Sequence, residues 1–529
     1  MAARHFGASI ALVALLAAAA TPSADAQAPQ RGGTLNSIIS PEPPTLMIGI
    51  NQTTPTAVVA GKIYESLLRY DTDLKPMPGL AKSWTISPDG KTYTFNLQQN
   101  VKWHDGKPFT ADDVVFTATK YLIEVHPRSR PIMQYAESVV ATDPNTVVFK
   151  LKESFAPFIM AWEPSTAPVV PKHIYEGTDF RSNPDNQTPI GTGPFKLKEW
   201  VRGSHIHLVR NDDYWQPGKP YLDAIYYRVL PDAGARVVAM ETGQTHLSAF
   251  SDIETFEVPR LKQLPHLELT TKGYEYLAQM VWLDFNLRVP PMNDRRFRQA
   301  VYYAMDRNFM RDRIWFGLGK IATGPIHSSI PHYDDKVTKY PFDLKKSEAL
   351  LDEMGLKRGA DGVRVRLTLD SLPYGDVYKR LAEYTKQALA RVGIEITIRT
   401  SDVAGWGDRI RNWDYEMTHQ VLSQLGHPAL GVSRLYVSSN IRKGVLFSNV
   451  NGYSNPRVDE LFAQAAVAVS DADRQRMYSE IQRILVDDVP VAWLLELDFP
   501  TFINKQFKNV VTSGIGVRDT FADVYMVPR

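Results

Sequence analysis

Few residues in this sequence have the types and spacing of a catalytic or metal site. His205 and His207 are two positions apart in an alternating segment, so both rings would share one strand face and could bind a metal ion. With no carboxylate or third histidine nearby in sequence, such a face is more typical of a solvent-exposed strand. There is no G-x-S-x-G, H-E-x-x-H or phosphate-loop motif. A two-carboxylate hydrolase stays open because acidic residues are abundant, but the pattern favours binding over catalysis.

Composition limits the chemistry further. The chain has 529 residues, too many for one hydrophobic core, so we expect two to four domains. It has no cysteine, which excludes disulfides, cysteine nucleophiles, cysteine-ligated zinc and a lipid-anchor cysteine. A net charge of +2 argues against a nucleic-acid partner, which would normally require a concentrated basic stripe.

The first residues resemble an export signal. Arg4 belongs to a short basic start, residues 10–20 form an unbroken apolar and small run, and Ala24-Asp25-Ala26 fits the A-x-A cleavage pattern. The run is too short to span a bilayer, although a retained signal anchor is the alternative. We therefore predict a signal peptide over residues 1–26 and a periplasmic mature protein that is not inserted in the membrane.

One of the predicted elements that must position any site is a β-hairpin. Alternating apolar residues over 84–86 and 93–97 flank the turn Pro88-Asp89-Gly90 and predict two paired strands. Downstream, Thr110 can cap a helix, with Asp113 three residues later completing a capping box. Elsewhere in this half, the patterns predict strands over 33–39 and 224–229 and helices over 57–68 and 233–242.

The second half alternates helices and strands. Capping residues predict helices that begin at Asp294, Asp343, Asn455 and Ser470. Between them, the patterns predict a strand over 363–369, a helix over 377–392 and a strand over 394–399. This alternation is typical of an α/β lobe with crossover connections. The whole chain therefore predicts two α/β lobes and a β-rich insert.

A series of short motifs runs along most of the chain. They are residues 64–67 (YESL), 79–84 (GLAKSW), 102–117 (KWHDGKPFTADDVVFT), 191–195 (GTGPF), 211–215 (NDDYW), 286–300 (NLRVPPMNDRRFRQA) and 452–456 (GYSNP). Any one of them is weak alone, but together and in this order they argue against a chance match. The chain resembles the extracytoplasmic solute-binding proteins of ABC importers, in the large peptide-, nickel- and opine-binding class (family 5).

That resemblance implies an α/β fold shaped as a bilobal clamshell, with a β-rich third domain. Domain I would be discontinuous, over residues 27–70, 191–285 and 499–529. Domain II, the β-rich insert, would cover residues 71–190, and domain III, the second α/β lobe, residues 286–498. The ligand would lie between domains I and III and be enclosed when the hinge closes.

One departure from the family bears on the ligand. Peptide-binding relatives hold the ligand's α-amino group with an acidic residue in domain III, and an ungapped placement puts Gln424 at that position. An amide offers only dipoles to an ammonium, and burying an unpaired charge costs on the order of several kcal/mol. Either Glu275 or Asp252 compensates, or the ligand lacks a free cationic amine. The second alternative is favoured, with an opine, a sugar-containing compound or an acidic small molecule as the ligand.

The remaining site candidates come from loops and aromatic residues. In the family, the segment that corresponds to residues 243–246 (GQTH) usually carries two acidic residues, and this chain has neither. A substitution at the surface without functional effect also explains their absence. Trp406 stands between two glycines and is predicted to lie in a loop, whereas Trp103 in the 102–117 motif is expected to be structural. The predicted ligand-binding residues are Asn51, Gln52, Thr53, Thr54, Ser248, Phe250, Tyr274, Tyr276, Trp406, Ser423, Gln424 and His427. Of these, the two tyrosines could equally belong to a core.

The function that the resemblance implies is capture of a small ligand, such as a peptide, an opine or a related compound. The closed protein would then dock on an inner-membrane ABC permease. We expect a monomer without a cofactor, a bound metal or catalytic residues. Two alternatives stay open: a chaperone or ligand-presenting partner of a chemoreceptor, which shares the fold, and an exported glycosidase-type hydrolase.

Overall fold

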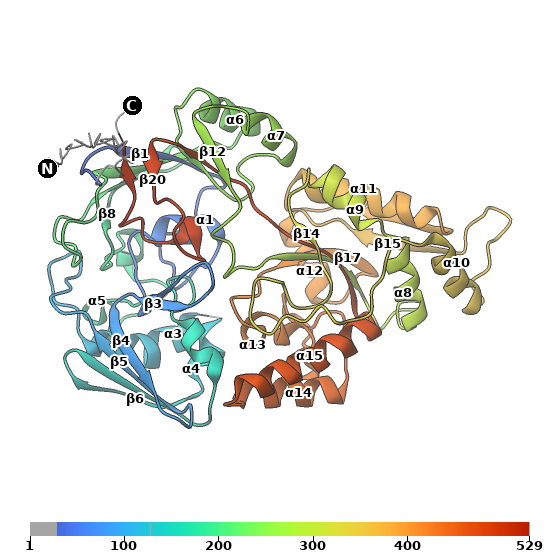
Figure 1. Cartoon of the computed structure of the whole chain (residues 1–529), viewed down its shortest axis with the longest axis horizontal. Coiled ribbons are helices and arrows are strands. Elements are labelled where there is room, and N and C mark those ends of the chain that lie inside the picture. The colour runs from blue at the N-terminus through green and yellow to red at the C-terminus, as the bar shows by residue number, and fades with distance from the viewer. Residues whose placement is uncertain (1–28, 127, 528–529) are drawn as a thin grey trace, which may run out of the picture.

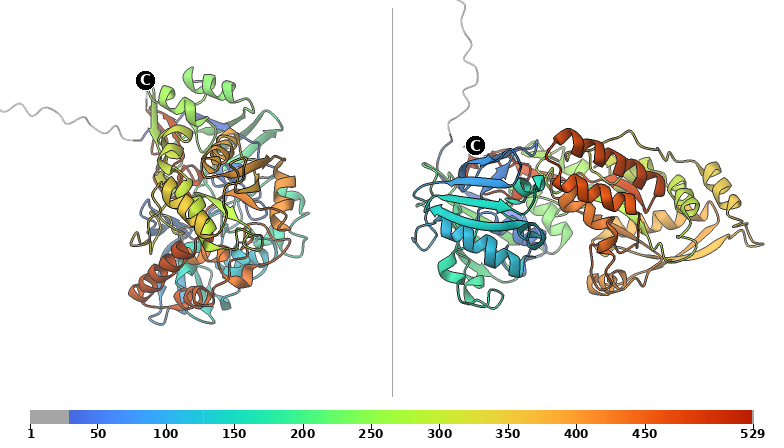
Figure 2. Two further views of the ribbon diagram at one scale, coloured as in Figure 1. Left: turned by 90° about the vertical axis from the view of Figure 1, so that its right-hand side faces the viewer. Right: turned by 90° about the horizontal axis from the view of Figure 1, so that it is seen from below.

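The computed structural model describes residues 29–126 and 128–527, so the predicted signal peptide lies outside the described residues. Two lobes stand side by side, and they stay side by side when the molecule is seen from below (Figures 1 and 2). Each lobe is built around its own mixed β-sheet. None of the described helices has the length and apolar character needed to cross a bilayer.

A seven-stranded sheet forms the centre of the first lobe, in the order β12-β19-β11-β1-β10-β9-β8. Its strands are β1 (Thr34–Ile39), β8 (Phe195–Val201), β9 (His205–Arg210), β10 (Ala224–Val229), β11 (Leu247–Ser248), β12 (Leu267–Thr270) and β19 (Thr501–Asn504). β1 pairs in parallel with β10 and β11, while β8, β9 and β10 pair antiparallel. The sheet therefore joins stretches that are far apart in the chain.

A four-stranded antiparallel sheet completes the first lobe, in the order β4-β5-β7-β6. Its strands are β4 (Ala81–Ile86), β5 (Thr92–Leu97), β6 (Ala136–Asp143) and β7 (Thr146–Leu151). β4 and β5 form the predicted hairpin, and the predicted capping box of Thr110 and Asp113 is present.

The helices of this lobe are α1 (Thr54–Ala60), α2 (Ala111–Phe116), α3 (Leu122–Val125), α4 (Ser129–Met133), α5 (Lys172–Tyr175), α6 (Ala233–Glu241) and α7 (Val258–Leu261). Two short strand pairs, β2 (Leu68–Tyr70) with β3 (Pro76–Pro78) and β20 (Phe507–Lys508) with β21 (Tyr525–Met526), lie beside them.

The helix predicted over 57–68 is wrong in its extent, because α1 ends at Ala60. Beyond it, the carbonyl oxygens of Lys62 and Ile63 accept hydrogen bonds from the amides of Phe195 (3.1 Å) and Gly193 (2.9 Å). A Cβ at Gly191 would lie 1.8 Å from the oxygen of Ile63, so only glycine fits there. The GTGPF segment thus takes up the backbone groups that a longer helix would have used.

The second lobe has a six-stranded sheet in the order β14-β18-β13-β17-β15-β16. Its strands are β13 (Met280–Phe285), β14 (Lys320–Ile321), β15 (Val365–Asp370), β16 (Ile394–Arg399), β17 (Met417–Leu422) and β18 (Val491–Glu496). β15 pairs in parallel with both β16 and β17, which confirms the predicted crossover connections. The helices are α8 (Arg295–Ala304), α9 (Arg307–Phe309), α10 (Leu344–Glu353), α11 (Asp376–Ala390), α12 (Val403–Arg411), α13 (Pro428–Gly431), α14 (Pro456–Val467) and α15 (Asp471–Asp488).

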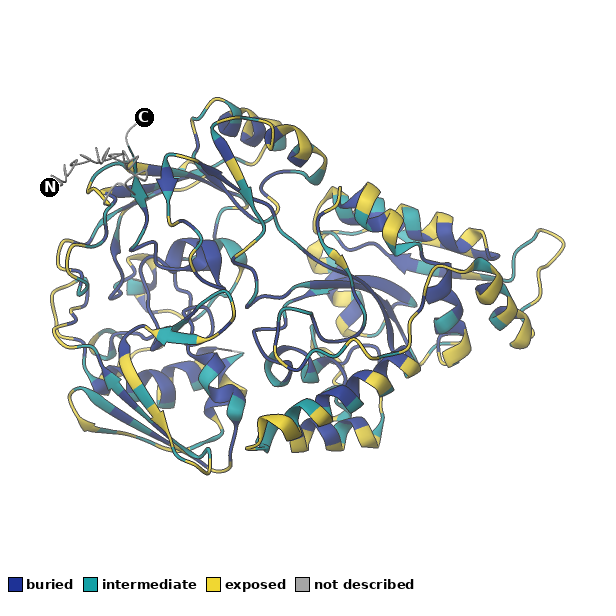
Figure 3. Cartoon of the chain, in the orientation of Figure 1, coloured by how far each residue is buried: buried dark blue, intermediate teal, exposed yellow. Residues whose placement is uncertain are grey.

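The four predicted helix starts of this lobe are confirmed by their caps. The side chains of Asp294, Asp343, Asn455 and Ser470 each accept a backbone N–H of the first turn. The central strands β13 and β18 are buried along their whole length, while α10, α14 and α15 expose their outer faces (Figure 3). The helices of the second lobe therefore cover a buried central sheet.

Candidate functional site

The two lobes are joined where the chain passes from one sheet to the other. It leaves the first lobe between β12 and β13, over residues 271–279, and returns between β18 and β19, over residues 497–500. Both connections run through the middle of the molecule (Figure 1). Two neighbouring segments of this kind can act as a hinge between lobes, which makes the junction between the lobes the candidate site.

Predicted site residues Phe250 and Tyr274 meet at these crossings. Their rings lie 5.0 Å apart, and both pack against Phe499 of the return segment. The Tyr274 hydroxyl accepts the Phe250 N–H (3.1 Å) and lies 2.5 Å from Oγ1 of Thr501. Beside them, Ser248 is buried in β11, and its hydroxyl has no partner among the described residues.

Tyr276 brings the two lobes into contact. It is fully buried, and its hydroxyl donates to the carbonyl oxygen of Met160 (2.8 Å) in the 3₁₀ turn η2 (Ala156–Ala161) of the first lobe. A Cβ at Gly426, in the second lobe, would lie 2.9 Å from Cε of Met160 and 3.0 Å from Cδ2 of Tyr276. Since Gly426 also has a φ of +70°, this close approach between lobes requires glycine.

The loop that holds Ser423, Gln424 and His427 therefore lies at the junction, but Gln424 does not point into open space. Its Oε1 accepts the His327 N–H (2.9 Å), and its Nε2 donates to the Pro325 carbonyl (2.8 Å). The Ser423 hydroxyl accepts from Gln279 (3.0 Å). Gln424 thus anchors its own loop within the second lobe, and no free amide group is left for a ligand.

His427 is likewise engaged in packing. It caps α13 by accepting the Ala429 N–H (3.1 Å), and its ring contacts those of His332 and Tyr478. Burial lowers the pKa of His427 well below its ordinary value, so the ring is neutral and brings no charge to the junction.

The residues over 51–54 are held by local hydrogen bonds. Asn51 accepts from the amide (3.0 Å) and hydroxyl (2.6 Å) of Thr53, and Gln52 donates to Ile48 and Gly49. Thr54 is the first residue of α1. No hydrogen bond of the described structure links this group to the other predicted site residues, and ligand contact by it stays a prediction.

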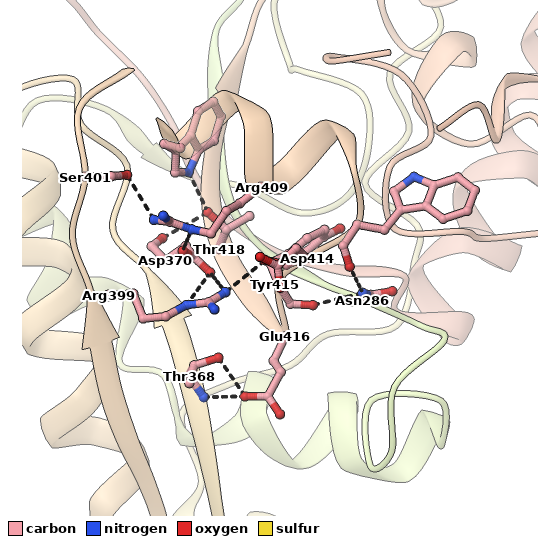
Figure 4. A network of polar contacts seen from close by, with 12 residues as sticks. Asn286, Thr368, Asp370, Arg399, Ser401, Arg409, Asp414, Tyr415, Glu416 and Thr418 are labelled. Atoms are coloured by element: carbon pink, nitrogen blue, oxygen red, sulfur yellow. Dashed lines mark hydrogen bonds and ion pairs between the residues drawn. The ribbon is translucent and has the colours of Figure 1, made fainter. Parts of the chain in front are cut away.

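The prediction that Trp406 lies in a loop is wrong. Trp406 is in helix α12, is 1% exposed, and donates from Nε1 to Oγ1 of Thr418 (3.0 Å). Asp402 starts the helix by accepting the Gly405 N–H (2.8 Å), and this cap outweighs the two glycines. Figure 4 shows the polar network that holds α12 against the sheet, in which Arg409 binds Asp370.

The histidine pair also differs from its prediction. Glu199 supplies the carboxylate that was missing in sequence: its Oε1 lies 3.4 Å from His205 and 3.6 Å from His207. The His205 ring stacks on Tyr226, so this face is only partly exposed. Among the described residues, no group of three or more histidine, aspartate or glutamate side chains is arranged to hold a metal ion.

Several of the sequence motifs form hydrogen bonds with one another inside the first lobe. Glu65 of YESL accepts hydrogen bonds from Thr192 of GTGPF (2.9 Å) and from Tyr214 (2.8 Å) and Trp215 (3.1 Å) of NDDYW. Burial raises the pKa of this carboxyl to about 7. Trp103 is buried and donates to Asp113 (3.3 Å). The family motifs therefore meet one another inside the lobe.

Three arginines at the junction were missed by sequence reasoning. Arg128 precedes α4, Arg518 ends the 3₁₀ turn η8 (Gly516–Arg518), and Arg434 lies just after α13 in the second lobe. We call them the junction arginines. They come from stretches without a shared motif, so no local signal in the sequence connects them.

Comparison with known proteins finds a matching family and several similar proteins. The family described as bacterial extracellular solute-binding proteins, family 5, matches residues 75–443. The oligopeptide-binding protein AppA of Bacillus subtilis is 29% identical over 484 residues, which cover 88% of this chain and 86% of AppA. The glutathione-binding protein GsiB of Escherichia coli O1:K1 is 29% identical over 451 residues, 83% of this chain and 84% of GsiB. The solved ABC transporter substrate-binding protein CtaP of Listeria monocytogenes matches with a TM-score of 0.82 and 26% identity, over 94% of this chain and 100% of CtaP.

Two lobes with separate sheets, joined by two crossing segments, define a bilobal ligand-binding protein. The chain belongs to the bacterial extracellular solute-binding proteins, family 5. It is the substrate-binding component of an ABC importer. The resemblance inferred from the motifs is thereby confirmed, and so is the bilobal α/β fold.

Proposed function

We propose that this protein captures a small solute at the junction between its lobes and delivers it to an inner-membrane permease. The observation that carries the proposal is the contact between Tyr276, Met160 and Gly426, where loops of both lobes meet beside the two crossings. A ligand bound there touches both lobes and favours the closed form. A shift from 1:99 to 99:1 in favour of closure requires about 5.5 kcal/mol of differential affinity.

The domain division implied by the resemblance is part of this proposal. The seven-stranded sheet supports a discontinuous domain I, because it combines β1, β8 to β12 and β19. The four-stranded sheet supports a separate domain II within residues 71–190, and the six-stranded sheet supports domain III within residues 286–498. We also propose a periplasmic location and a monomer, since hinge closure of one chain is enough for capture.

The proposed ligand class combines the names of relatives with the contacts of Gln424. The names of two relatives refer to oligopeptides and to glutathione, so a peptide or peptide-like solute is one candidate. Gln424 lacks a carboxylate, and its amide is already hydrogen-bonded on both sides. It therefore cannot neutralise a peptide's α-ammonium group. We propose a ligand without a free cationic amine, such as an opine or an acidic peptide-like compound, and no catalytic step.

Lobe closure can be measured directly because the chain has no native cysteine. Val238 in the first lobe and Val469 in the second are 52% and 56% exposed, so cysteines at both positions can carry a donor and an acceptor dye. We expect a cell extract rich in small metabolites to change the energy transfer between the lobes. A control pair within the second lobe, at Val403 and Val469, should not respond.

Native mass spectrometry of the freshly purified protein, followed by denaturation, would identify any solute that it carries. An unchanged inter-lobe distance with every extract, together with the absence of a carried solute, would disprove capture by closure.

A further inference from the structure

A series of contacts leads from Arg518 through one carboxylate towards the second lobe. Arg518 donates to the hydroxyl of Ser165 (3.1 Å), and the Ser165 amide donates to Glu163 (2.9 Å). Glu163 also accepts from Thr166 (2.7 Å), whose hydroxyl lies 3.5 Å from that of Tyr276. Tyr276 in turn touches Gly426.

The series reaches the second lobe at Arg434. This residue donates weakly to the carbonyl oxygen of Ser423 (3.4 Å), in the same loop as Gly426. Arg128 lies between His126, whose Nε2 is 3.1 Å from the Ser165 carbonyl oxygen, and Ser129, whose hydroxyl donates to the Thr166 carbonyl oxygen. This position brings Arg128 within electrostatic reach of Glu163, Arg434 and Arg518. The three arginines thus lie near the segments 163–166 and 423–426, and they come from both lobes.

The hydrogen-bonding capacity of these arginines is largely unused. Arg518 is only 4% exposed, yet its Nε and Nη2 have no partner among the described residues. Arg434 contacts only backbone carbonyls, those of Gly431 (3.2 Å) and Ser423. In the described part of the chain, none of the three junction arginines forms an ion pair. Arg518 is buried, whereas Arg128 and Arg434 are partly exposed. A buried charge is normally paired, so the unpaired Arg518 is costly unless something else supplies the negative charge.

The protein itself does not balance this charge. Glu163 is the carboxylate next to the group, is fully buried, and is already bound by Ser165 and Thr166. His126, which faces Arg128, adds no charge, because burial lowers its pKa to about 3. The two other acids considered from sequence are used locally: Asp252 accepts the Ala249 N–H and Glu275 accepts the Gly273 N–H. Asp519, which follows Arg518 in the chain, is paired with Arg69 (2.6 Å). The three junction arginines with Glu163 therefore leave an excess of two positive charges.

We infer that the solute captured by this protein is an organic dianion, bound through its carboxylate or phosphate oxygens by Arg128, Arg434 and Arg518. The inference rests on the proposed capture function and specifies its ligand class. The planar guanidinium group pairs with carboxylate and phosphate in a bidentate way, which suits both anions. Because Arg434 belongs to the second lobe and the other two to the first, a dianion joins the lobes and neutralises the repulsion that opposes closure.

The test is calorimetric titration of the protein with matched probes. Glutarate and glucose 6-phosphate are the dianions, and glutaramide and glucose are their neutral counterparts. We expect at least one dianion series to bind, with its neutral counterpart roughly a hundredfold weaker or undetectable. Binding by glutarate or by glucose 6-phosphate distinguishes a carboxylate ligand from a phosphate ligand.

Single variants then assign the binding to these residues. Arg128→Gln, Arg434→Gln and Arg518→Gln should each weaken dianion binding roughly ten- to a hundredfold, while Arg434→Lys, which keeps the charge but not the fork, should weaken it less. Arg311→Gln is the control, since Arg311 is on the surface and paired with Asp312.

The dianion assignment is wrong if neither dianion binds, if the neutral counterparts bind as tightly, or if the glutamine variants bind like wild type. The first two of these outcomes are measured on the wild-type protein, so they do not depend on whether the variants fold. Failure of this inference is distinguishable from failure of the capture function: closure of the dye-labelled lobes by a neutral or cationic solute would disprove only the charge assignment.

Discussion

Two groups of arginines in this protein differ in whether the protein supplies carboxylates that balance their charge. In the second lobe, Arg399 and Arg409 both lie 2.6 Å from the carboxylate of Asp370, which has no exposed surface (Figure 4). We call this group the Asp370 node. At the lobe junction, three arginines share a single carboxylate that is already hydrogen-bonded elsewhere. Charge that the fold itself balances has a structural role, whereas charge left unbalanced at the junction between the lobes indicates a binding partner.

The strongest test of this contrast removes the carboxylate of the Asp370 node. Asp370→Asn leaves Arg399 and Arg409 without their anion, so we expect a loss of roughly 3–5 kcal/mol in the free energy of unfolding. Urea denaturation followed by circular dichroism measures it. Asp361→Asn, which breaks the exposed pair with Arg366, is the control and should cost about 0.5 kcal/mol or less. Equal effects of the two variants would contradict the structural role of the node.

A buried carboxylate without an arginine in contact gives the converse case. Asp284 accepts hydrogen bonds from Trp282 (3.2 Å), Tyr415 (3.1 Å) and Gln420 (2.9 Å), and burial raises its pKa from 3.8 to about 7. Between these pH values the folded protein holds a proton that the unfolded chain has released. This contribution to stability is therefore full below pH 3.8 and is lost as the pH rises through 7.

The variant Asp284→Asn should remove this dependence. We expect the difference in unfolding free energy between wild type and variant to change by up to about 1.4 kcal/mol per pH unit between pH 4 and 7, in favour of the variant at high pH. Denaturation at several pH values measures it. A difference that is constant with pH would show that Asp284 is ionised throughout.

At the junction, removing a charged side chain should not destabilise the ligand-free protein. Arg518→Gln removes an uncompensated buried charge, so we expect the ligand-free protein to keep its stability or to gain about 1 kcal/mol. Thermal unfolding without added anions measures the change. If this variant instead loses as much stability as Asp370→Asn, then Arg518 has an internal partner and the contrast between the two groups fails.

The smallest expected effect comes from an ion pair between the lobes near the protein surface. Arg380 on α11 lies 3.7 Å from Glu254 and 3.5 Å from Oγ1 of Thr255, both of the first lobe. Because this pair is partly exposed, Arg380→Ala should cost about 0.5 kcal/mol or less. The dye-labelled lobes should nevertheless show a shift towards the open form without ligand. An unchanged distance would mean that the pair has no part in closure.

Most of the regular structure followed from local signals. The helix starts at Asp294, Asp343, Asn455 and Ser470 were predictable because a capping side chain bonds to the backbone only two or three residues away. Of the two errors, the extent of α1 has a tertiary cause, whereas the helix around Trp406 has a local cap of the same kind that was overlooked in the sequence. α1 ends early because Lys62 and Ile63 bond to the GTGPF segment, and Trp406 is helical because Asp402 caps α12 and the sheet covers the indole.

The sequence by itself determined the family, the two α/β lobes and most of the elements, since these depend on motifs, hydrophobic period and caps. It also showed that Gln424 carries no charge. Only the tertiary structure decided that the Gln424 amide is already occupied and that Arg128, Arg434 and Arg518 meet at the junction. The physical reason is distance along the chain: side chains from three remote stretches approach one another only through the packing of the two lobes, which no local pattern encodes.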